Sequence, residues 1–362
     1  MALVAPNRPS IGNGAHTVID SIAPYLTLPA IIAGAIAASL NVYALSAGAD
    51  FGGGVWDLLA SGPRRDRQRA LIADAIAPIW EANHVWLILV IVLLFTAFPA
   101  AFARLTTKLH IPLTLTLFGI VLRGSAFTFR SYDSRRDTVQ RRWGRIFAIA
   151  STMTPFLLGI IIGAVATGAV VEPAPGSFAS TYVWPWLDAF PVAVGMLALA
   201  LFAFLAAVYL TIEATDPSLQ EDFRRRALIA ALAVALLALV ALVLARSRAP
   251  LVWAALTHGV LATVFRVSAG LFALGAVWAL WRRRYRAARA AAVAEVSLIV
   301  WGWAFGQFPY VVPPDITVQS AAAPTATLRL LVAALLVGLA VLAPSLRYLF
   351  KVFKGRRAAK LL

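Results

Sequence analysis

The sequence GADFGGGVWDLL (residues 48–59) follows directly on a long apolar run and carries two aspartates, Asp50 and Asp57. Glycines and large apolar residues surround both acids. A charged side chain near the centre of a bilayer costs at least ~2.5–3.5 kcal/mol, so a carboxylate in such surroundings predicts a functional role. We therefore interpret the rest of the chain as a frame that holds acidic groups inside a membrane.

A second acidic segment, IWEANHVWL (residues 79–87), lies beyond a short basic loop and carries Glu81, Asn83 and His84. Glu81 and His84 are three residues apart, so on a helix they share one face. Arg123, in a later apolar segment, is the expected partner of Glu81. Two interpretations stay open, which are a buried ion pair that fixes helix packing and a proton relay.

The composition places the chain among membrane proteins. Of its 362 residues 61% are hydrophobic and 13% are charged, and the mean hydropathy is +0.82. Soluble domains carry about 25% charged residues. A single soluble domain could not bury so much apolar surface, so the sequence predicts an all-α polytopic membrane protein.

Cysteine is absent, which excludes disulfides, thiolate metal sites and thiol nucleophiles. The four histidines are scattered along the chain, so we expect no metal or heme held by this chain alone. The run GADFGGG lacks the lysine of a nucleotide-binding loop, which argues against ATP-driven transport. The net charge of +16 does not indicate nucleic acid, because the basic residues form short clusters between apolar runs.

A membrane-spanning helix needs about 20 mainly apolar residues. Nine segments meet this length, and the first can continue to residue 59. They are residues 25–47, 72–100, 109–128, 145–170, 184–212, 227–245, 256–281, 290–311 and 327–350.

The distribution of Lys and Arg predicts the orientation. With nine spans and the N-terminus outside, five basic clusters and the C-terminus lie on the cytoplasmic side. The clusters are Arg64, Arg65, Arg67 and Arg69; Arg130, Arg135, Arg136, Arg141, Arg142 and Arg145; Arg224, Arg225 and Arg226; Arg282, Arg283, Arg284, Arg286 and Arg289; and Arg347, Lys351, Lys354, Arg356, Arg357 and Lys360. We expect a polar outer segment at 1–24 without a cleavable signal, one membrane domain at 25–350 and a basic cytoplasmic tail at 351–362.

Glycine spacing predicts close helix packing at two places. Gly48 and Gly52 form a GxxxG pattern, and Gly54 extends it. Small residues at this spacing let the backbones of membrane helices approach each other. Asp50 lies within the pattern, so its carboxylate is expected on a tightly packed face that protons can reach. The pattern GIIIG at residues 159–163 carries no acid and predicts packing alone.

Four segments together resemble subunit II of the cytochrome bd-type terminal quinol oxidases, cyanide-insensitive bd-like members included. The glycine and acid elements are GADFGGG (48–54) and APIWEANHVWL (77–87). Two further matches are LRGSAFTFR (122–130) and FPYVVPPDITVQSAAAP (308–324). The similarity extends over nearly the whole chain.

The resemblance implies the smaller subunit of a membrane heterodimer that oxidises quinol and reduces dioxygen to water. It implies two b-type hemes and one d-type heme, or a b-type heme in its place, all ligated by subunit I. It also implies a prokaryotic cytoplasmic (inner) membrane, a quinone pool, surrounding lipid and room for a small extra subunit. The chain alone would not be catalytic.

The resemblance also implies residue roles. Asp50 and Glu81 would belong to a proton path from the cytoplasm, and Arg123 would supply a buried countercharge. Gly48, Gly52 and Gly54 would be packing residues, and Trp80, Asn83 and Trp86 would shape the contact between subunits. Many family members have Asp at the position of Glu81, so this chain carries the longer acid there.

Two other functions compete with this interpretation. A proton-coupled secondary transporter could use the same acids, but such folds show repeated, broken helices in matched positions. No second copy of residues 48–86 is evident in the sequence. A purely structural assembly subunit, in which the acids serve only as countercharges, is the other alternative.

Overall fold

The computed structural model describes the backbone of residues 26–76, 80–132, 137–170 and 176–358. Within these ranges it describes the side chains except those of residues 80–82, 130–132, 137–141, 346 and 349–358. The predicted outer segment 1–24 lies outside the described residues. The predicted tail does so in part, because the last helix continues to Ala358.

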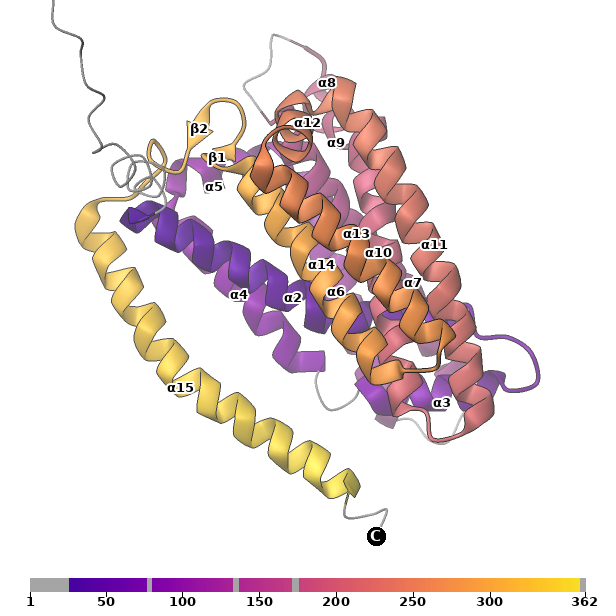
Figure 1. The fold of residues 1–362 in the computed structure, drawn as a ribbon. Helices are drawn as coiled ribbons and strands as arrows, with labels where there is room; N and C mark the ends of the chain where they lie inside the picture. The colour runs from indigo at the N-terminus through magenta and orange to yellow at the C-terminus, as the bar shows by residue number, and fades with distance from the viewer. Residues whose placement is uncertain (1–25, 77–79, 133–136, 171–175, 359–362) are drawn as a thin grey trace, which may run out of the picture.

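The described chain is almost entirely helical (Figure 1). Its elements are α2 (Leu28–Leu58), α3 (Arg65–Ile76), α4 (Trp80–Ala97), α5 (Pro99–Lys108), α6 (His110–Tyr132), α7 (Asp137–Ala166), α8 (Phe178–Tyr182), α9 (Trp184–Leu187), α10 (Ala189–Glu213), α11 (Pro217–Arg248), α12 (Pro250–Thr257), α13 (Val260–Trp281), α14 (Tyr285–Gln307), β1 (Tyr310–Val312), β2 (Ile316–Thr317) and α15 (Thr325–Ala358). The two short strands form an antiparallel hairpin that the all-helical expectation did not include.

Among the described residues, eight helices are long and apolar enough to cross a membrane. A ninth span arises if the bent pair Asn83–Ala97 and Pro99–Lys108 is taken together. Each of the nine segments expected from the sequence overlaps one of these eight helices or the bent pair, so the all-α membrane fold is confirmed. The orientation of the two termini stays a prediction. The extension of the first span is confirmed as well, since α2 runs through Leu58.

The second expected span, residues 72–100, is wrong in its boundaries. Residues 72–76 belong to α3, and α4 starts only at Trp80. At its other end α4 stops before Pro99, where the chain turns by 118° into α5. Proline has no backbone N–H to donate and disfavours a helical conformation at the preceding residue, so Phe98 leaves the helix.

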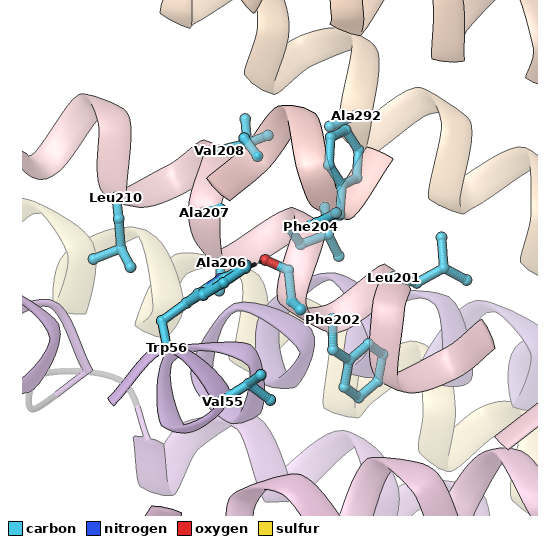
Figure 2. Close-up of a cluster of buried hydrophobic side chains, with 14 of the residues drawn as sticks. Val55, Trp56, Leu201, Phe202, Phe204, Ala206, Ala207, Val208, Leu210 and Ala292 are labelled. Atoms are coloured by element: carbon cyan, nitrogen blue, oxygen red, sulfur yellow. Dashed lines mark hydrogen bonds between the residues drawn. The ribbon is translucent and has the colours of Figure 1, made fainter. Parts of the chain in front are cut away.

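Helix α10 is the central element of the bundle and packs against α2, α7, α11 and α14. Its side chains from Ala200 to Val208 are all buried. Figure 2 shows how Trp56 of α2 meets this helix, with its indole nitrogen donating to the carbonyl of Ala203 at 2.7 Å. The buried indole thus keeps its hydrogen bond while its ring fills the core. By contrast, α15 lies along the edge of the bundle and is mostly exposed (Figure 1).

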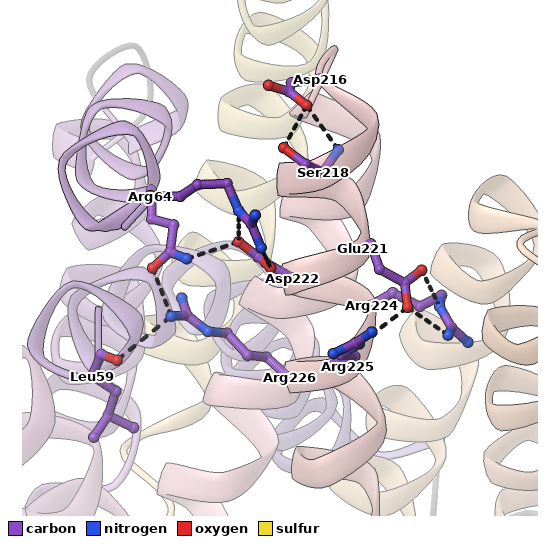
Figure 3. A network of polar contacts seen from close by, with 10 residues as sticks. Leu59, Arg64, Asp216, Ser218, Glu221, Asp222, Arg224, Arg225 and Arg226 are labelled. Carbon is purple, nitrogen blue, oxygen red and sulfur yellow. Dashed lines mark hydrogen bonds and ion pairs between the residues drawn. The ribbon is translucent and has the colours of Figure 1, made fainter. Parts of the chain in front are cut away.

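Polar contacts join the start of α3 and the start of α11, including the residue just before each helix (Figure 3). Arg64 donates to both carboxylate oxygens of Asp222, at 2.8 and 2.6 Å. Gln68 donates to Asp222 and accepts from Arg226, whose guanidinium lies over the ring of Trp56. Helix α11 begins at Pro217, so Glu221 and Asp222 lie within its first turns.

Asp216 caps the first turn of α11, and this cap predicts an acid-sensitive contribution to stability. Its carboxylate accepts from the backbone N–H and the hydroxyl of Ser218, both at 2.7 Å, and pairs with Arg67. The two bonds from Ser218, then Arg67, lower the pKa of Asp216 from 3.8 to about 2. A lowered pKa adds stability above the unfolded value, and this is lost as the pH falls through the folded value.

The Asp216→Ala variant should therefore unfold at a lower temperature than the parent at neutral pH. The gap should persist down to about pH 4 and close as the pH falls to about 2. Thermal unfolding followed by tryptophan fluorescence measures it, with the exposed Asp66→Ala as control. A gap of constant size over the whole pH range would show that the carboxylate charge does not act at this cap.

Candidate functional site

Asp50 and Arg123 form an ion pair inside the bundle. Asp50 lies on α2 and Arg123 on α6, and each side chain is at most 1% exposed. Arg123 also donates from Nε to the hydroxyl of Ser151 on α7, at 3.1 Å. Its guanidinium lies over the rings of Phe51 and Phe147, at 4.7 and 5.1 Å from their centroids. The positive charge is therefore held by one carboxylate, one hydroxyl and two aromatic faces.

The other oxygen of Asp50 is less tightly held. Asn83 of α4 lies 3.5 Å from Asp50 Oδ2, and its amide nitrogen is also 3.4 Å from the carbonyl of Ser46. Asn83 is 4% exposed. Arg123 Nη1 is buried and has no hydrogen-bond partner among the described residues. The site thus joins α2, α4, α6 and α7. Arg123 Nη1 can still donate a hydrogen bond, and Asp50 Oδ2 can still accept one.

The glycines of the first segment allow this convergence, because they bring other helices against α2. A Cβ atom on Gly52 would lie 1.9 Å from the carbonyl oxygen of Phe202, and one on Gly54 would lie 2.1 Å from Cβ of Ser151. Gly48 faces the side chain of Phe202 as well. The predicted close packing is present, but its face differs from the one expected for Asp50. Gly48 and Gly52 face α10, whereas the carboxylate points toward α6 and α4.

The side chains of Trp80 and Glu81 lie outside the described residues, and only their backbone is placed, in the first turn of α4. The expected pairing of Glu81 with Arg123 therefore stays a prediction. Trp86 is half-buried and packs against the central core. The amide of Asn83 contacts Asp50 inside this chain. Its expected place at the contact between subunits stays a prediction.

The described histidines do not fit an axial pair for a heme. His110 lies against the ring of Tyr182, and His258 contacts Thr257 at the end of α12. His84 lies near the rings of Tyr43 and Phe51, with centroids 6.3 and 6.2 Å away. Its Nδ1 is buried and has no hydrogen-bond partner among the described residues. The three described histidines therefore lie in separate parts of the bundle.

Sequence reasoning did not identify three side chains that contact Arg123 in this site. Ser151, Phe51 and Phe147 contact Arg123, and no local pattern sets them apart from other serines and phenylalanines in apolar helices. Asp57 is 2% exposed and lies 3.7 Å from Arg69 Nε. The sequence had singled out Asp57 together with Asp50, and their spacing of seven residues places both near one face of α2.

The comparisons with known proteins agree with this architecture. The family model for cytochrome bd terminal oxidase subunit II matches residues 28–353. A Bacillus subtilis protein assigned to subunit II of a cytochrome bd menaquinol oxidase is 24% identical over 324 residues, covering 86% of this chain and 91% of that protein.

Two further similarities are narrower or concern the fold alone. Subunit 2 of the cytochrome bd-I ubiquinol oxidase of Escherichia coli K12 is 31% identical over 122 residues, which is 33% of this chain and 31% of that subunit. The solved structure of bd oxidase from Geobacillus thermodenitrificans has a chain of the same fold, with a TM-score of 0.77 and 23% identity. It covers 91% of this chain and 99% of that chain. The family model matches almost the whole described bundle, and the chain therefore belongs to the family of cytochrome bd terminal oxidase subunits II.

Proposed function

We propose that this chain conducts protons through Asp50 and Glu81 toward the oxygen-reducing site of a heme-bearing partner subunit. The family places the chain in a quinol oxidase complex of the respiratory chain. The observation that carries the proposal is a carboxylate deep in the bundle, with one oxygen fixed by Arg123 and the other only weakly bonded. A buried carboxylate with a free acceptor position is the group a proton path in a membrane requires.

The positions of the acids support access from the basic end of the bundle. Asp57 lies at that end beside Arg69, and Asp50 follows two helical turns deeper on the same helix. At 1.5 Å per residue the two positions are about 10 Å apart along the axis. Glu81 is in the first turn of α4, so it too lies nearer a helix end than Asn83 does. The positive-inside rule makes the basic end cytoplasmic, which is where protons are taken up in this proposal.

The partner is proposed to be a subunit I that ligates two b-type hemes and a d-type heme, or a b-type heme instead. The hemes would supply electron transfer and oxygen binding, with quinol as the reductant. The proposed location is the cytoplasmic membrane of a prokaryote, with the N-terminus outside and the C-terminus in the cytoplasm. Trp80 and Trp86 stay predicted contacts to the partner.

The Glu81→Gln variant of the complete oxidase tests the proposal. Gln has the shape of Glu but cannot carry a proton, so quinol-dependent oxygen consumption should fall by roughly 100-fold, the lower end of what a positioned proton-transfer group contributes. The reduced-minus-oxidised spectrum of the purified complex should keep its heme bands, because assembly does not depend on this proton.

Glu213→Gln is the matched control, since it makes the same change at the end of α10. It should leave oxygen consumption unchanged. Full activity of Glu81→Gln would remove Glu81 from the path and leave the acids as countercharges. A chain that purifies without heme and without a larger partner would favour the transporter alternative.

A further inference from the structure

A cavity of about 540 Å³ lies where α13 turns into α14. The turn itself carries Arg283 and Arg284, and α14 starts directly after them. We call this cavity the arginine pocket. It is lined by Ile212, Gln220, Arg283, Arg284, Tyr285, Arg286 and Ala287.

The arginine pocket has an excess of positive charge. Glu221 is the acid beside it, 3.5 Å from Arg283, but Glu221 also pairs with Arg224 and Arg225 at 2.7 and 3.2 Å. The guanidinium of Arg284 lies over the ring of Trp278. Within the described ranges, neither Arg284 nor Arg286 has an ion pair. The pocket therefore suits an anion, and guanidinium groups bind phosphate oxygens in a bidentate geometry.

An apolar groove continues from this pocket between α13 and α14. It has a volume of about 400 Å³ and shares Ala287 with the pocket. Its walls combine small residues with side chains that are open to the surroundings, since Leu271 is 64% and Trp278 49% exposed. The lining residues are Ser268, Leu271, Phe272, Gly275, Trp278, Ala279, Ala287 and Ala291. These helices cross the membrane, so the groove runs from its surface toward its interior.

We propose that the pocket and the groove together bind one anionic phospholipid, with its phosphate at Arg284 and Arg286 and one acyl chain along the groove. Basic pockets between membrane helices on the cytoplasmic side recognise anionic headgroups. A free anion would use the pocket but not the groove, and a neutral lipid would use the groove but not the charge. The occupant that uses both is a lipid with a net negative headgroup.

The experiment measures lipid retention by the purified, delipidated oxidase complex. Dioleoyl phosphatidylglycerol is added back, and bound molecules are counted by native mass spectrometry. The variant Arg283→Gln/Arg284→Gln/Arg286→Gln should lower the affinity at this site by roughly tenfold or more, since each basic residue near a membrane surface contributes severalfold. Arg246→Gln/Arg266→Gln/Arg329→Gln removes equal charge elsewhere and should retain the lipid.

A second variant tests the groove without altering charge. Gly275 lines the groove and has open space around its Cα, so Gly275→Leu should fill the groove and reduce retention severalfold. Gly270→Leu adds the same side chain to the same helix at another open position and is the matched control. Equal retention in the arginine variant and its control would overturn the proposal. So would equal binding of dioleoyl phosphatidylcholine, or displacement of the lipid by inorganic phosphate alone.

Discussion

The Asp50→Asn variant is expected to destabilise the folded subunit by about 3–5 kcal/mol, the cost of leaving one partner of a buried ion pair without the other. Arg123 would keep its charge at 1% exposure, with only the Ser151 hydroxyl and two aromatic faces around it. Thermal unfolding of the purified complex and the heme content of the membranes measure the effect. The unfolding temperature and the heme content should both decrease, because a subunit that does not fold cannot hold its partner.

The double variant Asp50→Asn/Arg123→Gln separates the ion pair from a general loss of packing. With both charges removed, the penalty for an unpaired charge disappears, so the double variant should be less destabilised than the sum of the two single variants. Asp188→Asn is the matched control, because it removes an ion pair with Arg248 whose side chains are 32% and 54% exposed. Exposed pairs contribute about 0–1 kcal/mol. Strictly additive single effects would contradict the pairing of Asp50 with Arg123.

This pair also bears on what the sequence could predict. Asp50 was identified from its apolar surroundings, which is a local property of the chain. Its partner was not, because Arg123 is separated from both Asp50 and Glu81 by many residues. Only the packing of the folded bundle, in which α6 and α2 both pack against α7, decides which acid it meets. Sequence alone favoured Glu81. In the structure Arg123 forms its ion pair with Asp50. The side chain of Glu81 lies outside the described residues.

The helices were predictable for a physical reason. A bilayer requires about 20 apolar residues for each span, and this requirement is visible in the sequence. The boundaries that differ from the expected ones are set by something other than the length of an apolar run. The bend at Phe98 follows from the next residue, Pro99, and the polar start of α11 extends beyond the apolar run because Arg64 and Arg67 bond its acids. The hairpin of Tyr310–Val312 and Ile316–Thr317 is too short to give a periodic pattern.

The Gly52→Ala variant should unfold at a markedly lower temperature than the parent, with a loss of about 3 kcal/mol or more. The new Cβ would lie 1.9 Å from the carbonyl oxygen of Phe202 and 2.8 Å from Cβ of Ala206. The nearest obstacle is backbone, which cannot rotate away as a side chain does. Helices α2 and α10 would have to separate, and the hydrogen bond from Trp56 to Ala203 would lengthen.

The same substitution at another position of α2 should not lower the unfolding temperature, and it therefore serves as the control. Gly34 has no atom within 4 Å of its added Cβ. Ala is favoured over Gly in a helix by up to about 1 kcal/mol, so Gly34→Ala should leave the unfolding temperature unchanged or raise it. The chemical change and the helix are identical, and only the distance to α10 differs. Equal unfolding temperatures for the two variants would therefore contradict the close approach of α2 to α10.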